Sequence, residues 1–175
     1  MDIKSKIRTI PDFPKPGIQF RDITTLLKDP QGFRYIIDHL TQRYCTKRID
    51  KIVGIESRGF IIGGALAHQL NVGFVPARKP GKLPAETEYV KYELEYGTDK
   101  IEIHTDAIKH GDIILVVDDL IATAGTLGAA IDLIEKLGGQ VFECAVIIEL
   151  PALRGREKIE KRGHKLYSLV EFEGD

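Results

Sequence analysis

Two adjacent carboxylates, Asp118 and Asp119, follow a fully apolar run and precede a stretch of small residues. The apolar run, 113–117, predicts a buried strand that delivers the pair to the edge of a sheet. Ligands of open α/β sheets bind in the crevice at the carboxyl ends of the strands. The small residues that follow are Ala122, Thr123, Ala124, Gly125 and Thr126. Small side chains let backbone N–H groups approach an anion, and a helix that starts directly afterwards adds unpaired donors and a partial positive charge.

A phosphate bound at this loop would lie close to Asp118 and Asp119. Carboxylates repel phosphate, but they accept hydrogen bonds from hydroxyl groups. A ligand with a phosphate at one end and a diol nearby satisfies both halves of the pattern, and a ribose 5-phosphate is such a ligand. The alternative is that the two aspartates cap a loop before a helix and bind nothing.

Three other proteins that use acidic residues after a strand fit this sequence less well. A Walker B strand requires a G-x-x-x-x-G-K-[ST] loop, and a dinucleotide fold requires G-x-G-x-x-G after its first strand. Neither pattern occurs anywhere in the chain. A phospho-receiver domain carries its acidic pair near the first strand, whereas this pair lies at two-thirds of the chain.

The basic residues near predicted strand ends are further candidates for anion binding. Arg58 follows the predicted strand 51–55, and Arg78, Lys79 and Lys82 surround a loop rich in Pro and Gly. Without further context such a cluster is typical of a solvated surface. The five histidines have no metal-ligand spacing, and the two cysteines are far apart, which predicts reduced thiols.

Strand and helix patterns alternate from residue 51 onward, which predicts an α/β fold with a parallel sheet of about five strands. An alternating segment and its partner predict an antiparallel hairpin around 87–104, and Glu95 lies on the polar face of that alternation. The predicted strands are 51–55, 74–77, 113–117, 141–150 and 166–170, and the predicted helices are 3–10, 60–70, 126–137 and one that begins at Asp29-Pro30.

Length and composition exclude several classes of protein. The 175 residues suit one domain, and 43% hydrophobic with 29% charged residues is a globular composition. A net charge of −1 disfavours binding to nucleic acid. No apolar run approaches the roughly 18 residues that a membrane span needs, and no apolar N-terminal segment indicates secretion. We therefore expect a cytoplasmic protein with no nucleic-acid or membrane partner.

The motif VVDDLIATAGT at 116–126 resembles the phosphoribosyl diphosphate (PRPP) motif of the type I phosphoribosyltransferase family. Further segments are similar to the adenine phosphoribosyltransferase branch of that family, and the resemblance runs in order from about residue 8 to 172. These segments are FPKPGIQFRDIT at 13–24, GIESRGF at 54–60, ARKPGKLP at 77–84, YELEYG at 92–97 and ELPALRGREK at 149–158.

The resemblance implies a fold and a reaction. The fold is a phosphoribosyltransferase sheet flanked by helices, in a single domain over 1–175 with an N-terminal hood over about 1–30, a core over about 31–175 and a flexible flap over about 80–97. The reaction is purine salvage, in which adenine and PRPP give AMP and diphosphate with Mg²⁺ bound through the diphosphate. The family also implies a homodimer.

The resemblance also implies roles for individual residues. Asp118 and Asp119 would hold the ribose hydroxyls, and residues 122–126 the 5′-phosphate. The remaining PRPP-binding residues are Ser57, Arg58, Arg78, Lys79, Lys82 and Tyr96. Glu95 and Arg58 would be catalytic, Glu95 as the acid/base group. Phe20, Arg21 and Leu150 would bind adenine.

The sequence departs from the family pattern at one position, and two other functions are alternatives to adenine transfer. The family usually has glycine where this chain has Ala124, and alanine is strained there if the backbone needs a positive φ. The first alternative is a transferase for hypoxanthine, guanine or xanthine. The second is a protein of the same fold that senses PRPP or purines without turnover.

Overall fold

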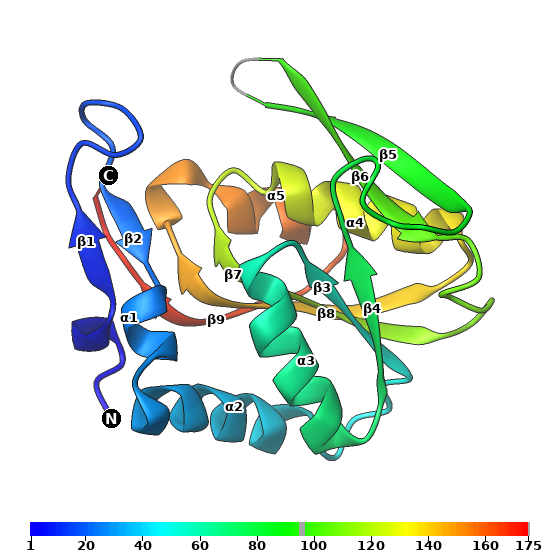
Figure 1. Cartoon of the computed structure of the whole chain (residues 1–175), viewed down its shortest axis with the longest axis horizontal. Coiled ribbons are helices and arrows are strands. Elements are labelled where there is room, and N and C mark those ends of the chain that lie inside the picture. The colour runs from blue at the N-terminus through cyan, green and yellow to red at the C-terminus, as the bar shows by residue number, and fades with distance from the viewer. Residues whose placement is uncertain (95–96, 175) are drawn as a thin grey trace.

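The centre of the molecule is a sheet of five strands, all of them parallel (Figure 1). The computed structural model describes residues 1–94 and 97–174. The sheet has the order β4-β3-β7-β8-β9. Its strands are β3 (Lys51–Ile55), β4 (Gly73–Ala77), β7 (Ile113–Ile121), β8 (Gln140–Glu149) and β9 (Leu166–Glu171). The predicted five-stranded parallel sheet is confirmed.

Helices cover both faces of this sheet, which explains why its strands are apolar without alternation. Figure 1 shows α2 and α3 on one side and α4 and α5 on the other. In β7, Ile114 and Val116 face the core beneath α4, whereas Leu115 and Val117 face the core beneath α2 and α3. The helices are α2 (Pro30–Tyr44), α3 (Arg58–Leu70), α4 (Gly125–Lys136) and α5 (Gly155–Lys161), with a 3₁₀ turn η2 (Pro151–Leu153) before the last.

Local sequence signals explain where two of these helices begin and end. The Asp29 side chain accepts a hydrogen bond from the Gln31 N–H and Pro30 occupies the first helical position, so the predicted start of α2 is confirmed. The α4 helix is followed by Gly138, which adopts a φ of 91°. None of the helices within the described residues has the length and apolar character that a bilayer crossing needs.

The N-terminal segment differs from the helix predicted over 3–10. Only a 3₁₀ turn, η1 (Lys4–Lys6), forms, and it is followed by β1 (Arg8–Ile10), which pairs antiparallel with β2 (Phe20–Asp22). Long-range strand pairing overrides the local helical spacing, because Ile10 lies opposite Phe20 while Ile3 and Ile7 still reach the core. A short helix, α1 (Thr24–Leu27), then leads to α2.

The predicted antiparallel hairpin is present as β5 (Thr87–Glu93) and β6 (Thr98–His104), and it extends over α4 (Figure 1). Ile101 and Ile103 join the core on the α4 side of the sheet. The predicted alternation includes Glu95. However, β5 ends at Glu93, and Glu95 and Tyr96 lie outside the described residues.

The strand that carries the acidic pair is longer than predicted. We expected it to end at Val117, but β7 continues to Ile121 because it keeps pairing with β8, with Asp118 opposite Val146 and Ile121 opposite Glu149. The two aspartates are therefore held by sheet hydrogen bonds rather than by a loop. In the same way α3 begins at Arg58 rather than Phe60, so Arg58 lies on the first turn of a helix.

Gly59 of α3 lies directly against the strand that carries the acidic pair. A Cβ at Gly59 would lie 2.8 Å from the carbonyl oxygen of Val117 and 3.2 Å from a carboxylate oxygen of Asp118. Gly64 of the same helix has nothing within 4 Å of such a Cβ. The close approach of α3 to β7 therefore depends on the first glycine and not on the second.

We predict opposite effects for alanine at these two positions. Gly59→Ala should lower the free energy of unfolding by about 1–3 kcal/mol, because backbone must shift to relieve the overlap. Gly64→Ala should raise it by about 0.5–1 kcal/mol, because alanine is the better helix former and no clash opposes it. Urea denaturation of both variants checks this, and equal effects would show that α3 does not depend on the close contact.

Candidate active site

A cavity of about 530 Å³ opens at the carboxyl ends of β3, β7 and β8, beneath the N-terminal hood. The residues expected from the sequence that line it come from five separate segments of the chain. They are Phe20, Arg21, Arg58, Lys79, Asp118, Asp119, Ala122, Thr123, Ala124, Gly125, Thr126 and Leu150. The fold thus brings together the acidic pair, the small-residue loop, two basic side chains and the hood.

The acidic pair is held by one cation. The Nε of Arg58 donates a hydrogen bond to the Asp119 carboxylate, which is only 7% exposed, and the Asp119 N–H donates to Asp118 Oδ1 at 2.8 Å. Loss of solvent contact, followed by the neighbouring Asp119 charge, raises the pKa of Asp118 well above its usual range, while Arg58 acts in the opposite direction. The pair can accept hydrogen bonds from hydroxyl groups, and its two charges repel each other until a ligand or Arg58 offsets them.

The small-residue loop bends so that the first turn of α4 opens toward the cavity. The N-cap residue is Ala124, and no described side chain caps the helix. The N–H groups of this turn are consequently available to an anion, and the helix dipole favours one. Behind the loop Gly155 packs so closely that a Cβ there would lie 2.4 Å from the Ala122 carbonyl oxygen.

Ala124 adopts the left-handed conformation, with φ 69° and ψ 12°. The condition stated from the sequence, that this position needs a positive φ, is therefore met. An L-residue in this region is disfavoured by about 1–2 kcal/mol, whereas glycine is not. The chain thus carries backbone strain in the loop proposed to bind an anion.

Glu56 organises the basic cluster, and the sequence analysis did not identify it. Lys82 and Arg78 both contact its carboxylate, Arg78 at 3.4 Å, and the Lys79 N–H donates to it at 2.9 Å. Burial opposes ionisation of Glu56, but the hydrogen bonds from Lys82, Lys79 and Arg78 outweigh it and lower its pKa to about 2. The cluster is therefore neutralised in part by its own carboxylate.

The other basic residues are also paired. The Lys79 ammonium lies 3.1 Å from the Asp99 carboxylate on β6, and this contact raises the pKa of Lys79. Ser57, Arg78 and Lys82 do not line the main cavity, and Arg78 instead borders a small adjoining cavity beside Tyr92. The Glu56–Ser57 peptide is cis.

The hood closes one side of the cavity with both apolar and polar groups. Phe20 and Arg21 of β2 line the cavity together with Leu150, which follows β8. The Arg58 guanidinium lies 5.9 Å from the centre of the Phe20 ring. Arg21 donates to Thr9 Oγ1 at 2.5 Å, while its buried Nε has no hydrogen-bond partner among the described residues.

Several lining residues were not predicted. Two predicted residues, Glu95 and Tyr96, lie outside the described residues. The unpredicted residues are Ile18, Gln19, Ile55, Glu56, Tyr92, Glu93, Leu94, Asp99, Leu120, Ile121, Leu127 and Leu153. The position of Glu56 directly after a buried strand, at the same sheet edge as the acidic pair, was the signal that could have revealed it.

The carboxylates that line the cavity determine how it could bind a metal ion. Within residues 1–94 and 97–174 no group of three or more His, Cys, Asp or Glu side chains could enclose a metal ion. Magnesium commonly binds to one or two carboxylates together with waters and substrate phosphates. The Asp118–Asp119 pair fits that mode and does not fit a site built from protein ligands alone.

The sequence and the structure of the chain are similar to those of one family of known proteins. Residues 22–173 match the model of the phosphoribosyl transferase domain. The chain is 62% identical to the adenine phosphoribosyltransferase of Chlorobaculum tepidum, with all of both chains covered. It is 51% identical to the crystal structure of adenine phosphoribosyltransferase from Thermoanaerobacter pseudethanolicus, with a TM-score of 0.93 and 98% of each chain covered.

A third relative was solved with ligands. The adenine phosphoribosyltransferase of Saccharomyces cerevisiae, complexed with D-2,5-dideoxy-2,5-imino-altritol 1,6-bisphosphate and adenine, is 41% identical to this chain. The TM-score is 0.90, and 97% of each chain is covered.

The strain at Ala124 leads to a prediction about stability. Ala124→Gly should raise the free energy of unfolding by up to about 1 kcal/mol, because glycine adopts the positive φ without steric cost. Ala122, two residues earlier, does not have a positive φ. Ala122→Gly should therefore lower the free energy of unfolding by about 0.5–1 kcal/mol, because glycine increases the conformational entropy of the unfolded chain. Denaturant titration of both variants checks the assignment. It is contradicted if both substitutions change the free energy of unfolding in the same direction.

The raised pKa of Asp118 leads to a prediction about pH. Since the folded protein holds this proton at pH values where the unfolded chain has released it, the wild type should lose stability as pH rises from the ordinary aspartate range through the raised pKa. Asp118→Asn should remove that loss, so its melting temperature should exceed that of the wild type increasingly across this window. The exposed Asp106→Asn serves as control, and parallel pH profiles for Asp118→Asn and the wild type would contradict the assignment.

Proposed function

The chain belongs to the adenine phosphoribosyltransferase family, and from this premise we propose that it transfers the 5-phosphoribosyl group of PRPP to adenine in purine salvage. The products are AMP and diphosphate. The observation that carries the proposal is that one cavity contains a carboxylate pair, an open helix N-terminus and the aromatic ring of Phe20 on the hood. These are the groups that a ribose diol, a 5′-phosphate and a flat base require.

The ribose 5-phosphate half of PRPP binds at the carboxyl edge of β7. Asp118 and Asp119 accept hydrogen bonds from the 2′- and 3′-hydroxyls, which offset the repulsion between the two carboxylates. The N–H groups and hydroxyls of residues 122–126 bind the 5′-phosphate. Binding of the diol replaces Arg58 as the partner of Asp119, so that the guanidinium is released toward the leaving group.

The diphosphate binds among the cations that surround Glu56. Arg58 and Lys79 line the cavity, and Ser57, Arg78 and Lys82 lie on the two loops next to them. The guanidinium group of Arg58 matches the geometry of phosphate oxygens. Magnesium would bind through the diphosphate, with Asp118 and Asp119 as the nearby carboxylates that could hold it, and it would supply additional positive charge for the leaving group.

Adenine binds beneath the hood, between Phe20 and Leu150, with Arg21 beside it. The aromatic ring and the aliphatic side chain provide apolar surfaces for the two faces of a purine. The name of the Saccharomyces cerevisiae complex, which pairs adenine with an imino-sugar bisphosphate, supports a cavity that holds a base and a phosphorylated sugar at the same time. Adenine as the base is supported by the three relatives named above, each of which is an adenine phosphoribosyltransferase. The other purines and the sensor without turnover are not favoured.

In the reaction, the bond between ribose C1 and the diphosphate oxygen breaks and the bond between C1 and adenine N9 forms. Positive charge develops on the sugar, and Asp118 and Asp119 stabilise it electrostatically. The electron pair of the broken bond leaves with the diphosphate, whose charge Arg58 and Lys79 offset. Glu95 takes the N9 proton, and the flap over about 80–97 excludes water that would hydrolyse PRPP.

On the family resemblance we also propose a homodimer that works in the cytoplasm, in which Arg78 reaches toward the site of the neighbouring subunit. The partial exposure of the Arg78 side chain, 32%, is compatible with such a contact.

The direct test measures diphosphate release from PRPP and Mg²⁺ with six separate bases: adenine, hypoxanthine, guanine, xanthine, orotate and uracil. We expect release with adenine alone. Release with another base would contradict the proposed base site, and tight PRPP binding without release would indicate a sensor.

The same assay tests the ribose site with the double variant Asp118→Asn/Asp119→Asn. We expect kcat/KM for PRPP to fall by roughly tenfold or more, because hydrogen bonds to charged acceptors are lost. Asp106→Asn is the matched control. A double variant within about threefold of the wild type, a difference below 1 kcal/mol, would contradict the assignment.

A further inference from the structure

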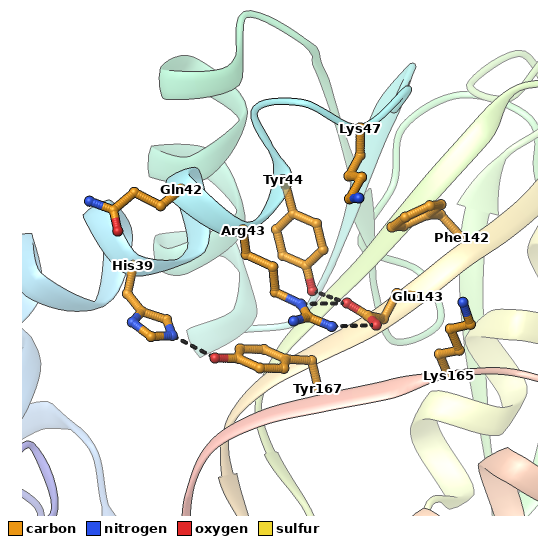
Figure 2. Close-up of a pocket in the computed structure, with 9 residues that line it drawn as sticks. All are labelled: His39, Gln42, Arg43, Tyr44, Lys47, Phe142, Glu143, Lys165 and Tyr167. Atoms are coloured by element: carbon orange, nitrogen blue, oxygen red, sulfur yellow. Dashed lines mark hydrogen bonds and ion pairs between the residues drawn. The ribbon is translucent and has the colours of Figure 1, made fainter.

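A second cavity, of about 610 Å³, lies at the opposite edge of the sheet from the active site. It is formed by the C-terminal half of α2 and the turn after it, and by the amino ends of β8 and β9. Figure 2 shows the nine side chains that line it, and none of them also lines the active-site cavity. Its volume falls in the range typical of small-molecule sites, about 300–1,000 Å³.

The charges around this cavity are unbalanced. Its one acidic lining residue, Glu143, is 4% exposed and already bonded to Arg43 at 2.8 and 2.9 Å and to the Tyr44 hydroxyl. Lys47 and Lys165 form no ion pair with any described residue. In the view of Figure 2 their ammonium groups extend toward Phe142 from opposite sides. Two positive charges therefore remain without a counter-charge at the cavity.

The Arg43–Glu143 pair is a fixed part of the wall. Burial, followed by the contact with Glu143, raises the pKa of Tyr44, so its hydroxyl stays protonated as a donor to the carboxylate. The Arg43 guanidinium lies 3.8 Å above the Tyr167 ring, which in turn hydrogen-bonds His39. Glu143 is consequently not available as a ligand for a metal ion or a cationic molecule.

Flat aromatic surface adjoins the two unpaired lysines. Phe142 is half-buried and packs edge-on against Tyr44, with ring centres 6.4 Å apart. Tyr167, also half-buried, stacks with His39. A ligand with a planar ring and a phosphate group would satisfy the aromatic surface and the two ammonium groups together.

We propose that this cavity is a second binding site, separate from the catalytic one, for a nucleoside phosphate whose phosphate lies between Lys47 and Lys165 and whose base stacks on Phe142. The proposal does not depend on which base the catalytic site uses. Three features carry it: a cavity of sufficient size, two unpaired cations and exposed ring surface beside them.

Isothermal titration calorimetry of the full chain with AMP tests the site. We expect two AMP molecules to bind each wild-type chain and one to bind Lys47→Ala/Lys165→Ala. The affinity of the second site for AMP should fall about tenfold or more in this variant, because two charge-assisted contacts are lost. The control Lys109→Ala/Lys161→Ala removes the same charge from exposed positions outside the cavity and should keep both sites. All four lysines are exposed, so melting temperatures should change little.

Two further titrations separate the phosphate from the base. Adenosine should show no second site, and inorganic phosphate should bind there more weakly than AMP. Phe142→Leu should weaken AMP at this site about fivefold or more through lost stacking and leave inorganic phosphate unaffected. Three results would overturn the proposal: one AMP per wild-type chain that Lys47→Ala/Lys165→Ala binds unchanged, a second site retained in that variant, or equal affinity of the second site for phosphate and AMP. One AMP per wild-type chain that Lys47→Ala/Lys165→Ala no longer binds would leave this proposal standing and would count against the proposed function.

Discussion

The placement of two like charges side by side on one strand is the constraint on which the catalytic end of the molecule depends. Asp118 and Asp119 are adjacent on β7, and one of them has lost most of its contact with solvent. Such a pair is unfavourable unless a cation or hydroxyl donors offset it. Arg58 is the cation in this structure, and it reaches Asp119 only because α3 begins at that residue and Gly59 lies against β7.

The charges of the proposed diphosphate site follow the same rule, because Glu56, Arg78, Lys79 and Lys82 are all paired within the protein. Glu56 binds two cationic side chains, and Lys79 is paired with Asp99. In the proposed reaction PRPP exchanges these pairs: its hydroxyls replace Arg58 at Asp119, and its phosphates replace carboxylates at the cations. Such an exchange keeps the free protein from carrying several unpaired charges in one cavity, at the cost of breaking these contacts when substrate binds.

Local sequence signals predicted most of the framework. Apolar runs located all five strands of the sheet, Asp29-Pro30 marked the start of α2, and the resemblance drew attention to the conformation of Ala124. The errors arose where distant pairing decided the outcome. The N-terminal segment became a strand because it pairs with β2, and β7 continued through the acidic pair because β8 runs beside it. Glu56 was missed for the same reason, since its partners lie 22 to 26 positions away along the chain.

A crystal structure of the protein with AMP and diphosphate would test whether the carboxylate pair binds the ribose. We expect ribose hydroxyls within about 3 Å of the Asp118 and Asp119 carboxylates. We also expect the 5′-phosphate at the N–H groups of residues 123–126 and an Arg58 side chain that has moved from Asp119 to the diphosphate. An Arg58 that stays paired with Asp119 while the ribose binds elsewhere would contradict this expectation.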